Sequence, residues 1–310
     1  MVRRPRCLRA VAALIVAALA AAACSSGHDQ GSVSTSSSSS TTTTTSSSVP
    51  TTTTTVDVFA LRPPTAAGDP AALAAQIADA ERALRDPATA EADVAAAALA
   101  QQVAYRQLGD HPEWDAAVIP ALPAEVQPSA ASHAAARREL RALSGAPRTT
   151  LPAWRIVAPA PLADLQKDYE AAGAAFGIPW GYLAAINLVE TGIGRIRGTS
   201  EAGAQGPMQF LPATWAAYGA GGDINDPHDA IFAAARLLAA DGAPADMAGA
   251  LYGYNHSDHY VQAITRYAEL IDQHPLTLRA IYHWGIYYRT IHGDVYLPVG
   301  YEQTAPVPAP

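Results

Sequence analysis

The sequence predicts a mainly α-helical protein that ends in a small β-hairpin. Apolar residues recur at helical spacing through most of residues 57–272. Pairs such as Asp69-Pro70 supply the capping and first-turn residues that open helices. From residue 281 to residue 298 the pattern changes to alternating aromatic and aliphatic residues, with a turn signal at Gly293. These observations predict helices followed by one terminal hairpin.

Residues 1–23 indicate a secretory signal. Several arginines precede an apolar stretch that is too short to cross a bilayer, which needs roughly 20 residues. The run from Ala21 to Cys24 resembles a bacterial lipobox, as in secreted lipoproteins of the actinobacterial type, although leucine is usual where Ala21 stands. Cleavage at an A-x-A site without lipidation is the alternative. We expect an extracytoplasmic protein, anchored through Cys24 to the outer face of the cell membrane or secreted into the cell-wall space.

Residues 24–56 consist almost entirely of serine and threonine. Such a composition cannot bury enough apolar surface to offset the entropy lost on ordering, so this segment is expected to be a disordered tether. The chain has two cysteines, and Cys7 lies inside the expected signal. The mature chain therefore has no partner for Cys24 within itself.

Residues 57–150 are rich in alanine and are expected to form three helices. The first follows Asp69-Pro70, the second spans roughly 88–108, and the third begins after Ser129. No residue here matches a catalytic pattern. The region is therefore interpreted as a spacer or packing collar, with a partner-docking module as the alternative. Protein partners stay unknown.

A proline-rich stretch at 146–161 marks the expected domain boundary. Residues 151–302 then form a second domain, and residues 303–310 a flexible tail. Because no motif precedes the boundary, we expect the second domain to act without the first.

Glu190 is the candidate catalytic residue. Leu183, Ile186 and Val189 have helical spacing, so Glu190 falls in the last turn of a mostly buried helix. Desolvation and the negative end of the helix dipole both oppose ionisation there. A carboxyl group that stays protonated near neutral pH is what a general acid needs to cleave a glycosidic bond. The alternative is an ordinary solvated glutamate at a helix end.

Three motifs accompany this acid. Glu190-Thr191 is followed by Ser200, then by the run GAQGPMQFLPATW that ends at Trp215, and then by Tyr254-Asn255. In this order they resemble the signature of soluble lytic transglycosylases, a lysozyme-like family that acts on peptidoglycan. The resemblance covers about residues 155–272 and implies a lysozyme-like catalytic domain.

The resemblance also implies a mechanism. The family cleaves the β-1,4 bond between N-acetylmuramic acid and N-acetylglucosamine without water, a lyase reaction that leaves a 1,6-anhydro ring. Glu190 would be the sole acid and base, because the attacking C6 hydroxyl belongs to the substrate and has a high effective concentration. The positions that match substrate contacts are Ser200, Gln209, Thr214, Tyr254 and Asn255. His256-Ser257 departs from the Ala-Gly that commonly follows the last motif.

Other functions stay open at this point. A lysozyme-type muramidase would hydrolyse the same bond with a second carboxylate, for which Glu201 and Asp223 are the candidates. A non-catalytic wall-binding lipoprotein could keep the cleft without the reaction, and a structural lipoprotein could act through its helical half.

Composition and spacing limit the partners. The chain has a net charge of −8 and no basic patch, which argues against nucleic-acid binding. His256 and His259 lack a third ligand at a recognisable spacing, so we expect no metal and no cofactor. The expected partners are peptidoglycan glycan strands and the membrane, through the lipid on Cys24.

Overall fold

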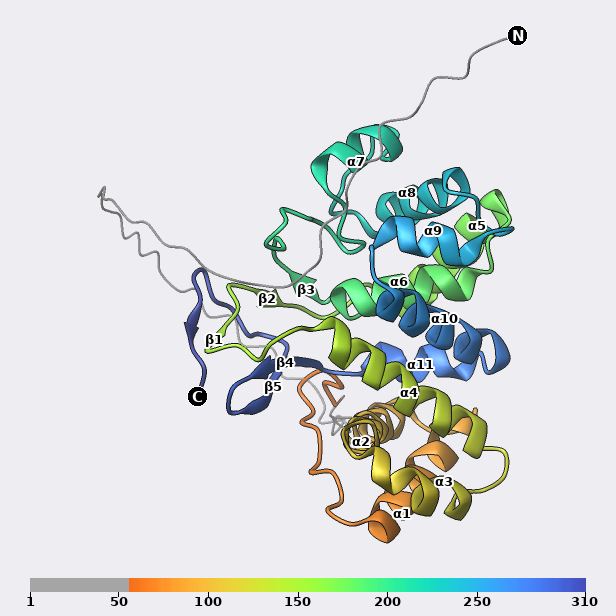
Figure 1. The fold of residues 1–310 in the computed structure, drawn as a ribbon, viewed down its shortest axis with the longest axis vertical. Coiled ribbons are helices and arrows are strands. Elements are labelled where there is room, and N and C mark those ends of the chain that lie inside the picture. Colours follow the sequence, from red (N-terminus) through yellow and green to blue (C-terminus); the bar gives the residue numbers. More distant parts are fainter. Residues whose placement is uncertain (1–55) are drawn as a thin grey trace, which may run out of the picture. The chain divides into compact units, whose positions relative to one another are not determined.

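Helices dominate residues 56–310, the part of the chain that the computed structural model describes (Figure 1). This part contains 11 α-helices, one short 3-10 turn (η1, Pro112–Trp114) and three two-stranded β pairs. The expected signal, the lipidation site at Cys24 and all but the last residue of the tether lie outside the described residues. The prediction of a mainly α protein with a terminal hairpin is confirmed.

The first four helices precede residue 150. Asp69 opens the first one as expected, because its carboxylate accepts a hydrogen bond from the backbone N–H of Ala72 at 2.9 Å. Two more follow where helical spacing predicted them. The sequence does not predict α3, which is short and contains Pro120. The bounds are α1 Pro70–Arg85, α2 Glu91–Asp110, α3 Asp115–Ala121 and α4 Gln127–Leu143.

Seven helices follow the proline-rich stretch. The expected amphipathic helix and the helix that carries Glu190 are both present, and each ends at a glycine with left-handed backbone, Gly177 and Gly192. Asp226 caps α8 by accepting from the N–H of Asp229. The bounds are α5 Leu162–Phe176, α6 Trp180–Thr191, α7 Pro212–Tyr218, α8 Pro227–Ala240, α9 Met247–Tyr254, α10 Asp258–Gln273 and α11 Leu276–His283.

The strands are short and antiparallel. The terminal hairpin pairs β4 with β5 around a turn at Ile291 and His292, close to the expected turn signal. Its alternating pattern starts at Ile286, because Tyr282 belongs to α11. In the tail that was expected to be flexible, β6 pairs with β1. The bounds are β1 Thr150–Leu151, β2 Arg155–Ile156, β3 Ile196–Arg197, β4 Ile286–Thr290, β5 Gly293–Leu297 and β6 Val307–Pro308.

One hydrophobic core extends across the expected domain boundary. Val94 on α2 and Ala136 on α4 belong to the same buried cluster as Leu183 on α6 and Ile264 on α10. The helix α4 packs along α10, and α2 packs against α11 (Figure 1). A second, smaller cluster that includes Leu108 holds α1 to α4 together. The helices before residue 150 therefore share their core with the rest of the described chain.

Buried hydrogen bonds reinforce this contact. The side-chain amide of Gln102 on α2 donates to the carbonyl of Gly285 at 2.9 Å and accepts from its N–H at 2.8 Å. The indole N–H of Trp284 donates to Gln101 at 3.0 Å, and Gln101 donates in turn to Glu81 at 2.8 Å. Such buried polar groups are costly to leave without partners, so removing α2 would penalise the remaining fold.

The shared core leads to a prediction that differs from the sequence-based expectation of an independent second domain. A fragment of residues 151–310 should lack a cooperative thermal unfolding transition, because α10 and α11 would expose the surfaces that α4 and α2 cover. Circular dichroism during heating measures this, with residues 57–310 as the control. If both fragments unfold cooperatively at the same temperature, the first four helices contribute nothing to the core.

Candidate active site

The helix α6 places Glu190 at the edge of a cavity. Its buried residues include Leu183 and Ile186, which fix the helix against the core. Gly192 ends the helix, and its N–H donates to the carbonyl of Leu188 at 2.9 Å. A side chain at Gly192 would have a Cβ only 2.3 Å from the Cδ1 atom of Ile286 on the hairpin. Gly192 also has a φ of 60°, a left-handed backbone conformation that favours glycine.

The carboxyl group of Glu190 is poised to exchange a proton near neutral pH. Burial raises the pKa of Glu190 to about 7, and a hydrogen bond from the Tyr260 hydroxyl at 2.8 Å partly opposes this rise. The residue is only partly exposed, towards the cavity. Desolvation, one of the two causes that the sequence predicted, is the dominant one. Such a group can both give and take a proton at physiological pH.

Two side chains of α6 hold the motif loop that faces Glu190. Asn187 donates to the carbonyl of Pro207 at 2.8 Å, and the hydroxyl of Thr191 donates to the same carbonyl at 2.6 Å. Both side chains are buried, and Asn187 also accepts from the hydroxyl of Tyr169 at 2.6 Å. The loop and the end of the helix are therefore held in one fixed arrangement.

The loop itself is a tight turn. Gln205 and Phe210 exchange two backbone hydrogen bonds of 2.9 Å. Gly206 has a φ of 75°, and a Cβ added there would lie 1.9 Å from the carbonyl oxygen of Ile224. Gln209, also with positive φ, lines the cavity and donates from its side chain to the carbonyl of Gly206 at 2.9 Å. This hydrogen bond fixes the side chain of Gln209 against its own turn.

Two tyrosines have separate roles at this site. The hydroxyl of Tyr254 donates to the backbone carbonyl of Met208 at 2.7 Å, so Tyr254 supports the loop from α9. Tyr260, in the first turn of α10, donates to Glu190 and lines the cavity. The two rings lie parallel with centroids 6.2 Å apart. The sequence singled out Tyr254 and missed Tyr260, for which no motif gave a signal.

The other matched positions differ in their surroundings. Ser200 lines the cavity, and its hydroxyl accepts from the N–H of Ala204 at 3.0 Å. Asn255 also lines the cavity, and its side-chain oxygen is buried without a hydrogen-bond partner. Thr214 lies on α7 and is not among the residues that line the cavity. Their contacts with substrate stay predictions.

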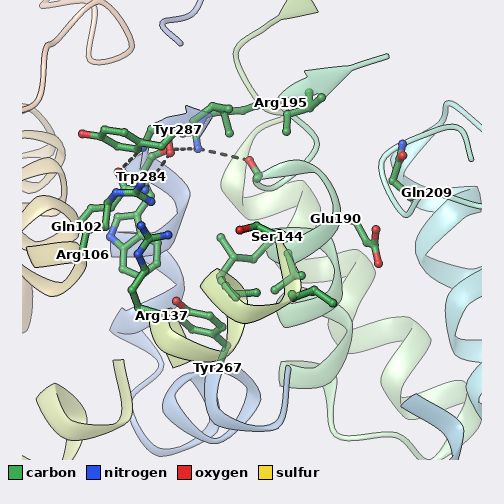
Figure 2. Close-up of a pocket in the computed structure, with 18 of the residues that line it drawn as sticks. Gln102, Arg106, Arg137, Ser144, Glu190, Arg195, Gln209, Tyr267, Trp284 and Tyr287 are labelled. Carbon is green, nitrogen blue, oxygen red and sulfur yellow. Dashed lines mark hydrogen bonds between the residues drawn. The ribbon is translucent and has the colours of Figure 1, made fainter. Parts of the chain in front are cut away.

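The cavity has a volume of about 320 Å³. One part of its lining comes from α6, the motif loop and the start of α10, and another from α2 and α4 (Figure 2). Trp154 adds a half-buried aromatic ring, packed edge-to-face against Tyr288 with centroids 5.3 Å apart. Aromatic faces of this kind suit the apolar faces of sugar rings. The contribution from α2 and α4 was not expected.

Carboxylic acid side chains are scarce in the lining of the cavity. Glu190 is the one carboxylic acid among the described residues that line the cavity. Glu201 and Asp223, the candidates for a second carboxylate, are exposed and lie outside the lining. His259 faces Glu139 at 2.7 Å. Within residues 56–310, no group of three or more His, Cys, Asp or Glu side chains could hold a metal ion.

Comparisons with protein-family models, with curated proteins and with solved structures found no match to this chain. In the described part of the chain, no helix has the length and apolar character needed to cross a membrane. Any assignment of function therefore rests on the site and on the motifs.

The raised pKa of Glu190 predicts a pH-dependent effect of Glu190→Gln on stability. The folded-state pKa of about 7 lies above the ordinary glutamate pKa of 4.5, so the folded protein binds this proton more tightly than the unfolded chain does. The contribution of Glu190 to stability is therefore present below pH 4.5 and is lost as the pH rises to 7. Between pH 4 and pH 8 the free energy of unfolding of Glu190→Gln should therefore rise by on the order of 1–3 kcal/mol relative to that of wild type.

Thermal unfolding at both pH values measures this change. The control is Glu201→Gln, which removes an exposed carboxylate outside the cavity. A melting-temperature difference between wild type and Glu190→Gln that is the same at both pH values would contradict the raised pKa.

Proposed function

We propose that the protein is a peptidoglycan lytic transglycosylase for cell-wall remodelling, with Glu190 as its single acid and base. The observation that supports this most directly is the position of Glu190, the one carboxylic acid among the described cavity-lining residues, where desolvation raises its pKa to about 7. A solvated glutamate would be ionised at neutral pH and could not protonate a leaving oxygen. The motif residues around Glu190 support the same function.

In the proposed reaction Glu190 first donates its proton to the oxygen of the scissile β-1,4 bond. The resulting carboxylate then accepts the proton of the muramoyl C6 hydroxyl while that oxygen closes the 1,6-anhydro ring. The hydrogen bond from Tyr260 stabilises the carboxylate between the two steps. Because the nucleophile belongs to the substrate, no protein carboxylate is needed to activate water.

We propose that α5 to α10 form a lysozyme-like catalytic region in which the cavity is the glycan cleft. Its support is the acid at the end of the buried helix α6, next to a loop held by Asn187 and Thr191. The protein would act outside the cytoplasm, through the signal and the lipid on Cys24 that the sequence predicts.

The hydrolase alternative receives less support. Retaining and inverting glycosidases place a second carboxylate roughly 5–5.5 Å or 6.5–9.5 Å from the acid. Glu201 and Asp223 are exposed, and neither lines the cavity. The non-catalytic alternative does not explain why a carboxyl group is kept in surroundings that oppose its ionisation.

Product analysis tests the proposal. Isolated cell wall is incubated with the protein, and the masses of the released muropeptides are measured by mass spectrometry. They should be lighter by one water than muropeptides with reducing ends. Glu190→Gln should lower turnover at least about 100-fold, the usual contribution of a positioned general acid. Glu201→Gln serves as the control and should retain turnover.

Three outcomes would contradict the proposal. Products with reducing ends would indicate a hydrolase, and near wild-type turnover in Glu190→Gln would remove this residue from the mechanism. A protein that binds wall without cleaving it would be a wall-binding module.

A further inference from the structure

Three guanidinium groups line the cavity that contains Glu190. Arg106 comes from α2, Arg137 from α4, and Arg195 from the segment after α6. We call these three residues the arginine wall. Figure 2 shows Arg106 and Arg137 on one side of the cavity, with Glu190 and Gln209 on the other side. The chain as a whole has a net charge of −8, so this concentration of positive charge is local.

Carboxylates do not fully balance Arg106 and Arg137. Both donate to Asp294 in the hairpin, which also pairs with Arg141. Arg137 and Arg141 lie 3.6 and 3.5 Å from Asp110. Three arginines therefore share two carboxylates. The Nε atom of Arg137 is buried without a hydrogen-bond partner, which leaves a charged donor unsatisfied in the cavity wall.

Arg195 is buried, and its hydrogen bonds go to backbone carbonyls, while the rings of Phe59 and Tyr282 lie 5.4 and 5.9 Å from its guanidinium carbon. Its guanidinium donates to the carbonyl of Tyr282 and, at 3.5 Å, to that of Gly192. It also donates to the carbonyl of Trp284 (Figure 2). Burial lowers the pKa of Arg195 and of Arg106 to about 10, so both remain cations at neutral pH. A buried cation that has no carboxylate partner stabilises an anion placed nearby.

Neutral polar and aromatic groups complete this end of the cavity. The ring of Tyr287 lies 4.1 Å from the guanidinium carbon of Arg106 and holds that side chain in place. His133 stacks on Tyr105, and its Nδ1 atom is also buried without a partner. Burial lowers the pKa of His133 to about 4, so the ring is neutral at physiological pH. The arginine wall is thus the charged feature here.

We propose that the arginine wall binds a carboxylate of the peptide stem that the glycan strand carries, so that peptide-bearing strands are the preferred substrate. This inference rests on the proposed function, since it names the substrate of the same site. The planar guanidinium fork matches a carboxylate geometrically and forms strong, charge-assisted hydrogen bonds with it. In such a strand the carboxyl of the lactyl group is bonded to the peptide, so the sugars carry no charge. Its carboxylates therefore belong to the stem.

The first test compares turnover of peptide-bearing strands with that of strands from which the peptides have been removed. Arg106→Gln and Arg137→Gln should each lower the ratio of the two kcat/KM values about tenfold, the effect of losing one charge-assisted hydrogen bond. Arg141→Gln is the matched control. Arg141 pairs with the same Asp294 and Asp110 but does not line the cavity. Its ratio should stay unchanged.

A ratio that changes less than twofold in both cavity variants, or that falls equally in Arg141→Gln, would overturn the inference. Arg106→Lys keeps the charge and guards against a loss caused by misfolding. It should recover part of the ratio that Arg106→Gln loses.

The second test measures binding without turnover. Calorimetry on Glu190→Gln compares a disaccharide–peptide with free carboxylates to the same fragment with its carboxylates amidated. We expect the amidated fragment to bind at least about tenfold more weakly. Equal binding of the two fragments, or binding of neither, would overturn the inference. This test does not depend on anhydro products, so a failure of the proposed reaction remains distinguishable from a failure of the arginine wall.

Discussion

The side of the cavity that carries Glu190 depends on one backbone carbonyl, that of Pro207, which accepts hydrogen bonds from two buried side chains of α6. In a dry interior neither Asn187 nor Thr191 can find another partner without cost, so the loop cannot move away from the end of the helix. Tyr254 fixes the next residue, Met208, from α9. The position of Glu190 relative to the loop follows from these three hydrogen bonds.

A second set of buried polar contacts fixes the opposite side. Arg195 joins the segment after α6 to the carbonyls of Tyr282 and Trp284, and Gln102 joins α2 to Gly285. The residues around position 284 thus contact both α2 and the end of α6. The helices before residue 150 are for this reason part of the cavity, and the segment between α11 and β4 is what connects them to it.

One end of the cavity disfavours charge, and the other end carries the arginines. At one end burial keeps Glu190 protonated up to a pKa of about 7, and the groups that shift this pKa are the apolar surroundings and Tyr260. No arginine contributes to that shift. A cation close to Glu190 would favour the carboxylate and lower its pKa. Placing the arginines at the far end allows the same cavity to hold a neutral acid and to attract an anionic group.

The sequence by itself determined the features that depend on neighbouring residues. Periodicity and caps gave the helices opened by Asp69 and Asp226, the glycine stops after α5 and α6, and the hairpin. They also placed Glu190 in the last turn of a buried helix, where desolvation raises its pKa.

Tertiary structure decided the contacts between distant residues. Tyr260 reaches Glu190 across 70 positions of sequence, and Arg106 meets Asp294 across 188. Helical spacing shows which face of a helix is buried but not which other helix covers it. For that reason the shared core, the role of Tyr254 in supporting the loop, and the arginine wall could not be predicted.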